Sequence, residues 1–167
     1  MVQDILTAPN PKLNQVSQRV QKLDKATQRL IGNLKDTLAG QKNPEGVGLS
    51  APQIGALRRI FVLRFTPKGG VTVVINPKIT KHSQKTNLDI SQNKEPDMEG
   101  CLSVPGVYAV VERPWKITAV YCDEDFKKVT QSLEGFAAVA FQHELDHLEG
   151  ILFTQRALEQ GSAIIVD

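Results

Sequence analysis

Two histidines four residues apart, with a glutamate directly after the first, form the segment of this sequence best suited to chemistry. The segment reads His143-Glu144-Leu145-Asp146-His147. Residues four apart lie on the same side of a helix, so both imidazoles can reach one metal ion. Glu144 lies next to them, close enough to exchange protons with a water molecule on that ion. The spacing therefore predicts a metal site on a helix.

A third protein ligand is not supplied by the residues that follow this segment. One large group of zinc peptidases reads H-E-x-x-H-x-x-G-x-x-H, and here Phe153 occupies the position of the third histidine. Other zinc peptidases use a downstream glutamate, for which the candidates are Glu149 and Glu159. Glu149 is too close to the helix to turn back, and Glu159 lies near the end of the sequence. We therefore expect the third ligand upstream.

The upstream candidates are Cys101, Cys122 and His82. His82 lies among lysine, serine and glutamine residues, which is typical of a solvated loop. Cys122 ends an alternating apolar segment and is interpreted as a small buried side chain. Cys101 follows Gly100, which allows a close backbone approach. A Cys101 thiolate with two neutral imidazoles would make a three-ligand site with a fourth position open for water.

A glycine-rich stretch over residues 46–55 could supply a group that stabilises negative charge. It contains Gly46, Gly48 and Gln53, and it lacks the Gly-Lys-Ser/Thr ending of a phosphate-binding loop. A neutral amide donor such as Gln53 beside a metal ion suits a developing oxyanion. Alone, the same stretch is equally compatible with a plain turn before a strand.

Two helices and several strands must position these residues. Leu30, Leu34 and Leu38 recur every four residues and predict a helix from about Asp24 to Leu38, ending near Gly40. A second helix is predicted from about residue 134 to 148, stopped by a glycine. One face of that helix is expected to point into the core and carries Phe136, Ala140, His143 and His147.

The remaining pattern predicts mostly antiparallel strands, which gives an α+β fold class with a late motif-bearing helix and an N-terminal helix. Residues 81–97 are polar and uneven and predict a long loop. The last residues, Ala163 to Val166, predict a short β-strand that packs on the body, because β-branched residues favour strands. An entry segment with an apolar side contains Leu13, Val16, Val20 and Leu23. The first two expected strands, residues 59–65 and 71–76, are separated by Pro67, Gly69 and Gly70. The other expected strands span residues 104–111, 116–122 and 127–133.

Composition limits the class of protein. With 167 residues, of which 41% are hydrophobic and 23% charged, we expect one domain over residues 1–167. A net charge of +2 argues against a direct nucleic-acid site. The longest purely apolar run, Phe136–Phe141, is too short to span a membrane. Residues 1–7 lack the features of a secretory leader, and two cysteines do not make a disulfide scaffold. The expected location is the cytoplasm.

Three segments together resemble the peptide deformylase family, metallohydrolases that remove the formyl group from N-formylmethionine at the start of nascent chains. The family pattern combines G-x-G-L-x-A-P-Q, E-G-C-L-S and Q-H-E-x-D-H-L-x-G, in that order. This chain has Gly46–Gln53, Glu99–Ser103 and Gln142–Gly150, and its opening Ile5–Leu13 also resembles the start of the family. The resemblance covers essentially the whole chain.

The resemblance implies a role for residues in each segment. Glu144 would be the general base and then the general acid. The side chain of Gln53 and the backbone N–H of Leu102 would hold the oxyanion. Glu99 and Arg113 match a family pair that steadies the cysteine loop. The implied metal ligands are Cys101, His143 and His147.

The resemblance also implies how a substrate binds. The backbone around Gly48 and Gly106 would bind the peptide as an added strand. Ser50 replaces the usual alanine, Tyr108 stands where some members have an arginine, and Val139 replaces an arginine common in one branch. The implied substrate-binding residues are Gly46, Val47, Gly48, Gly106, Tyr108, Phe136, Val139 and Ala140, of which Val47, Phe136, Val139 and Ala140 would line the methionine pocket.

The implied cofactor is one divalent metal ion per chain, Fe²⁺ in the cell, with Zn²⁺, Ni²⁺ or Co²⁺ as substitutes. The implied partners are N-formylmethionyl nascent peptides, with transient proximity to the ribosome. Two other interpretations stay open on the residues alone. A zinc-dependent endopeptidase or amidase would need a cleft open on both sides of the scissile bond. A binding module with a structural metal would need a closed site with four ligands.

Overall fold

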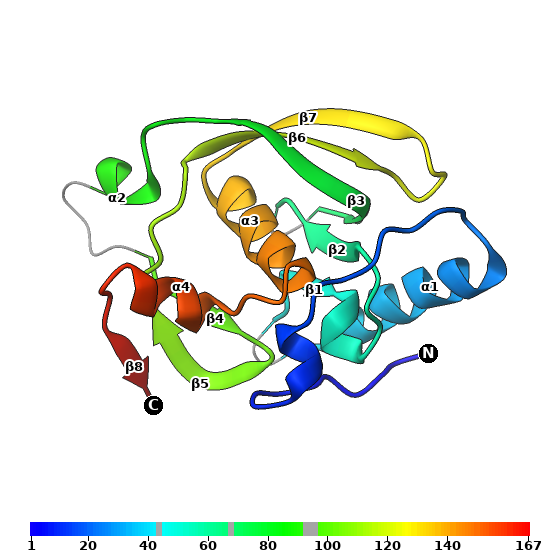
Figure 1. The fold of residues 1–167 in the computed structure, drawn as a ribbon, viewed down its shortest axis with the longest axis horizontal. Coiled ribbons are helices and arrows are strands. Elements are labelled where there is room, and N and C mark those ends of the chain that lie inside the picture. The colour runs from blue at the N-terminus through cyan, green and yellow to red at the C-terminus, as the bar shows by residue number, and fades with distance from the viewer. Residues whose placement is uncertain (43–44, 67–68, 92–96) are drawn as a thin grey trace.

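The computed structural model describes residues 1–167 except 43–44, 67–68 and 92–96. The turn expected at Pro67 and residues 92–96 of the loop expected over residues 81–97 therefore lie outside the described residues. The described elements form an α+β fold with two antiparallel sheets and a late helix, α3, between them (Figure 1). This is the fold class that the sequence predicted.

The larger sheet has five antiparallel strands. It follows the order β1-β2-β3-β6-β7. The hairpin β6–β7 pairs over seven residues without a register shift, whereas the β3–β6 pairing contains irregularities near Pro77 and Thr80. The strands are β1 (Gly48–Ser50), β2 (Ile60–Arg64), β3 (Val71–His82), β6 (Lys116–Cys122) and β7 (Lys128–Glu134).

The smaller sheet contains the cysteine segment and the tail. It follows the order β4-β5-β8, and β8 pairs antiparallel with β5. The prediction that residues 163–166 form a strand packed on the body is thus confirmed. The elements are β4 (Glu99–Cys101), β5 (Val104–Ala109) and β8 (Ile164–Val166).

Alternating residues of β2 and β3 build two cores, one on each face of the larger sheet. Ile60 and Val62 face α1 (Lys25–Gly40), and Phe61 and Leu63 face α3 (Phe136–Leu148). This alternation is the two-residue period of a strand with both faces covered. The sheet therefore gives α3, which carries the two motif histidines, a rigid apolar support.

Local signals in the sequence set the ends of both long helices. The Asp24 side chain accepts a hydrogen bond from Thr27 N at 2.9 Å and caps α1. After α3, Gly150 adopts a φ of +73°, and a Cβ there would lie 2.7 Å from the carbonyl carbon of Asn14. Only glycine fits where this turn meets the N-terminal segment. Among the described residues, no helix is long and apolar enough to cross a membrane.

Several sequence-based expectations were wrong in detail. The start of the expected loop over residues 81–97 continues β3 to His82, and the Thr86 capping box starts a short helix, α2 (Asn87–Ile90). A helix after the motif, α4 (Phe153–Glu159), was not predicted because only Phe153 and Ala157 of it are buried. Val16 is 63% exposed, so it does not belong to the apolar side of the entry segment. The described chain also has 3₁₀ helices η1 (Pro11–Asn14) and η2 (Ala51–Ile54).

Candidate metal centre and active site

One sulfur and two imidazoles converge where β4 meets α3. Cys101 ends β4, and His143 and His147 lie one helical turn apart on α3. One ligand atom from each residue lies within 4.8 Å of the others, and Cys101 Sγ is 3.2 Å from His147 Nε2. A thiolate with two imidazoles is a donor set for first-row divalent metals. The residues that the sequence pointed to are therefore close enough to hold one ion.

Glu99 and Arg113 fix the orientation of one imidazole. His143 Nδ1 donates to Glu99 Oε2 at 2.8 Å, which leaves the other ring nitrogen for a ligand bond. Arg113 donates to both oxygens of Glu99, from Nε at 2.5 Å and from Nη2 at 3.0 Å. Burial would raise the pKa of Glu99, but the hydrogen bonds from His143 and Arg113 outweigh it and lower the pKa to about 2. Glu99 is thus a permanent anion behind His143.

The two imidazoles of the cluster differ in how readily they hold a proton. Burial lowers the pKa of His147 well below its usual value, which keeps that ring neutral. Burial also disfavours charge on His143, yet Cys101 and Glu99 raise its pKa well above the usual value. A cation bound by His143 would therefore compete with a proton on that ring. The donor chemistry fits a divalent metal ion.

Glu144 is buried beside the cluster with a free carboxylate oxygen. Its side chain is 5% exposed, and within the described part of the chain its Oε2 has no hydrogen-bond partner. Burial raises the pKa of Glu144 to about 7, opposed by the charge of His143. A buried carboxyl without a partner is costly and is typical of a functional group.

Gly48 on β1 provides the space that Glu144 occupies. A Cβ at this position would lie 2.8 Å from Glu144 Cδ and 2.9 Å from Glu144 Cγ. Because Gly48 is in an extended strand, its role here is the missing side chain and not an unusual backbone angle. This contact explains physically why the glycine-rich stretch and the motif helix occur together.

We therefore predict that Gly48→Ala displaces Glu144. We expect kcat for formate release to fall about 100-fold, because a misplacement of about 1 Å can cost that much, while metal content is unchanged. The matched control is Gly32→Ala on α1, where an added Cβ meets nothing within 4 Å. That control should keep full activity and gain up to about 1 kcal/mol of stability. Full activity in Gly48→Ala would contradict the assigned contact.

Gln53 presents its amide nitrogen to the cysteine loop. Its Oε1 accepts from Ser50 N at 2.8 Å and from Ser50 Oγ at 2.9 Å. Its Nε2 therefore points to Cys101 Sγ at 3.5 Å and to Ser103 Oγ at 3.1 Å. Ser50 at the usual alanine position is more than a change between small residues, because its hydroxyl orients the Gln53 amide. Leu102 lies between the two residues that this amide contacts.

A cavity of about 680 Å³ opens in front of these groups. All eight residues expected to bind substrate line it, together with Gln53, Cys101, Leu102, His143 and Glu144. Of the α3 face expected to point into the core, His147 is buried, whereas Phe136, Ala140 and His143 line this cavity and Phe136 is 55% exposed. The sequence interpretation missed the lining residues Gln41, Glu45, Asn87, Ser91, Asp97, Met98, Gly100, Val104, Pro105, Val107 and Trp115.

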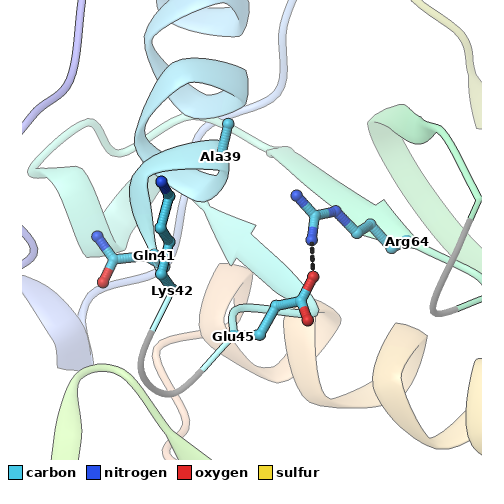
Figure 2. Close-up of a pocket in the computed structure, with 5 residues that line it drawn as sticks. All are labelled: Ala39, Gln41, Lys42, Glu45 and Arg64. Atoms are coloured by element: carbon cyan, nitrogen blue, oxygen red, sulfur yellow. Dashed lines mark hydrogen bonds and ion pairs between the residues drawn. The ribbon is translucent and has the colours of Figure 1, made fainter.

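A smaller polar hollow of about 320 Å³ adjoins the cavity at Gln41 and Glu45, which line both. Its other lining residues are Ala39, Lys42 and Arg64. Figure 2 shows Arg64 pointing to Glu45, with which it forms an ion pair of 2.8 Å. None of the candidate metal ligands lines this hollow.

The ligand candidates that the sequence analysis rejected lie outside the cluster. His82 is exposed at the end of β3, a strand end and not the loop expected. Cys122 on β6 packs against the core under α1. Glu149 pairs with Arg59 at 2.6 Å, and Glu159 lies 3.8 Å from Arg156. The cluster of Cys101, His143 and His147 contains none of them.

Known proteins are similar to this chain in sequence and in fold over nearly its whole length. The family model described as "Polypeptide deformylase" matches residues 2–162. The peptide deformylase of Desulforudis audaxviator (strain MP104C) is 41% identical over 153 residues, covering 92% of each chain. The crystal structure of peptide deformylase from Thermotoga maritima aligns with a TM-score of 0.81 and 34% identity, covering 93% of this chain and 97% of that one. The Ehrlichia chaffeensis peptide deformylase in complex with actinonin aligns with a TM-score of 0.81 and 32% identity, covering 93% and 88%.

The chain belongs to the peptide deformylase family. It is therefore an enzyme, a metal-dependent hydrolase that removes the N-formyl group from nascent peptides. Family membership decides against the general zinc peptidase or amidase and against the binding module with a closed structural metal site. It also accounts for the order of the three sequence motifs, each of which contributes residues to the same cavity.

Proposed function

We propose that Cys101, His143 and His147 hold the metal ion of this deformylase and that Glu144 transfers the protons. This proposal is supported by the three ligand atoms that lie within 4.8 Å of one another and by the buried carboxylate oxygen of Glu144 that has no hydrogen-bond partner among the described residues. The ion is Fe²⁺ in the cell, as the family resemblance implies, and Zn²⁺, Ni²⁺ or Co²⁺ can replace it because the mixed sulfur and nitrogen set suits all four.

When bound, such an ion makes water acidic near neutral pH and polarises the formyl oxygen. Glu144 takes a proton from the attacking water and later delivers it to the leaving amine of the peptide. Gln53 Nε2 and the backbone N–H of Leu102 stabilise the charge that develops on the formyl oxygen. Formate and a free N-terminal methionine result.

The peptide binds along the cavity as an added strand. Gly46, Gly48, Gly106 and Tyr108 line this cavity. The methionine side chain lies on the apolar face of α3, because residues spaced by three and four there line the cavity. This apolar face is formed by Phe136, Val139 and Ala140, and Val47 lines the same cavity.

Residues 1–167 act as one catalytic domain in the cytoplasm, near the ribosome that supplies the nascent chains. The family model covers residues 2–162, and the tail strand β8 pairs with β5, which lines the cavity. The net charge of +2 is too small to indicate a nucleic-acid site of its own.

The direct test is formate release from formyl-Met-Ala-Ser, measured with the Fe²⁺ form prepared without oxygen. Activity on this peptide and none on casein would support the proposal, and actinonin should block it by occupying the cavity. The reverse pattern, cleavage of casein without formate release, would overturn it. An enzyme that is active without a divalent metal ion would overturn the ligand assignment.

Oxidation should inactivate the Fe²⁺ form. A thiolate oxidises more readily than a thiol, and Cys101 lines a cavity open to small molecules. We expect the Fe²⁺ form to lose most of its activity in air, and catalase or replacement by Ni²⁺ to protect it. Activity and the mass of the peptide containing Cys101 should be followed together. An Fe²⁺ form that keeps its activity for days in air would contradict this prediction.

A further inference from the structure

A buried row of alternating charges connects His143 with the surface of the molecule. Behind His143 lies Glu99, which Arg113 holds by two hydrogen bonds. The third Arg113 donor, Nη1, reaches Asp146 Oδ2 at 2.8 Å. Arg156 closes the row by donating to Asp146 from Nη2 at 2.8 Å and from Nε at 3.2 Å. Neither Asp146 nor Arg156 has a role in the mechanism described above.

At the outer end of the row, Arg156 supplies the positive charge that pairs with Asp146. Glu99 and Asp146 contribute two negative charges, and Arg113 and Arg156 contribute two positive charges. The side chains of Glu99, Arg113 and Asp146 are all at most 10% exposed, so an imbalance would not be well screened by water. Arg156 is carried by α4 and is 37% exposed. It is the member of the row that can be changed without opening the core.

Arg113 is shared between two carboxylates, so the strength of one contact depends on the other. Its guanidinium is a rigid planar fork, with Nε and Nη2 on Glu99 and Nη1 on Asp146. Without Arg156, Asp146 would attract Arg113 alone and draw the fork away from Glu99. Glu99 would then hold the His143 ring less firmly.

We propose that Arg156 is a positioning residue of the metal centre, acting through Asp146, Arg113 and Glu99 on His143. The inference rests on the proposed assignment of His143 as a ligand. Outer partners of metal-binding histidines commonly change metal affinity 10- to 100-fold. This row has three links beyond the histidine, so we place the effect of Arg156 at about 10-fold. The competing interpretation is that Arg156 only attaches α4 to α3 (Figure 1).

The test compares Arg156→Ala with Arg59→Ala in the Zn²⁺-loaded protein. Arg59 pairs with Glu149, the residue that follows α3 as its C-cap, and does not contact the row. We expect Arg156→Ala to release metal to a chelator about 10-fold faster than wild type and to lower kcat about 10-fold. KM should not change, because Arg156 does not line the cavity. Arg59→Ala should lower Tm without changing metal release or kcat.

A double mutant separates charge balance from helix attachment. Asp146→Asn removes the charge that Arg156 balances, so adding Arg156→Ala to it should change metal release less than twofold. Arg156→Lys keeps the charge and should release metal more slowly than Arg156→Ala. If Asp146→Asn does not fold, the comparison of Arg156→Ala, Arg156→Lys and Arg59→Ala decides the question alone.

Unchanged metal release in Arg156→Ala, or release that follows Tm equally in all three arginine variants, would overturn the inference. Additive effects of Asp146→Asn and Arg156→Ala would overturn it as well. His143→Ala serves as the separate check of the ligand assignment. If His143→Ala kept its metal, both the proposed metal site and the positioning role of Arg156 would be wrong. Unchanged metal release in Arg156→Ala would leave the assignment of the metal site intact.

Discussion

Glu144→Gln is expected to lower turnover by at least ~100-fold while the protein stays folded and keeps its metal ion. Glutamine has almost the same shape but cannot accept a proton, and a positioned general base contributes about 100- to 10,000-fold. The Oε2 atom of Glu144 makes no hydrogen bond among the described residues, so the substitution removes no contact that holds the fold. The measurements are formate release, metal content and the circular dichroism spectrum of the same preparation.

The matched control is Glu149→Gln, which changes the glutamate that follows the same helix. Glu149 pairs with Arg59 at the surface and lies outside the cavity, so turnover should not change. Loss of the metal ion in Glu144→Gln would identify Glu144 as a ligand, contrary to our assignment. Turnover close to wild type would remove its role as the base.

The regular elements were predictable because their sequence signals are local. The Asp24 cap and the leucines at every fourth residue give α1, and the alternation over residues 116–122 gives β6 with the predicted bounds. The helix α4 has a weaker signal, since only one of its faces packs on β5.

In the candidate site, too, the residues with a local sequence signal were predictable and those defined by contacts across the fold were not. Cys101, His143 and Glu144 could be selected from spacing and residue type, because ligand and base chemistry limits the choice to few residues. Asp146 and Arg156 carry no such signal, since a charged residue on a helix is usually solvated and here both are defined by contacts across the fold. Trp115 lines the cavity only because β6 begins beside Gly135, the residue that precedes α3.

Cys101→Ala is expected to abolish tight metal binding. As a metal ligand Cys101 would bind as a thiolate and supply the negative charge of the ligand set, and without it only the two imidazoles of His143 and His147 remain. The loss should therefore exceed the 10- to 100-fold change that follows loss of an outer partner. Formate release should fall to background, and equilibrium dialysis with Zn²⁺ or Co²⁺ should show less than one ion per chain at concentrations that saturate the wild type.

Cys122→Ala provides the matched control for this loss. Cys122 is the other cysteine of the chain, and it pairs with Ile75 and Lys128 in the larger sheet, packed against the core under α1. Its replacement should lower Tm slightly and leave metal content and turnover unchanged, because only packing is lost. A Cys101→Ala protein with a full metal complement and normal turnover would show that the third ligand is not Cys101, and the role of the cysteine loop in the mechanism would have to be abandoned.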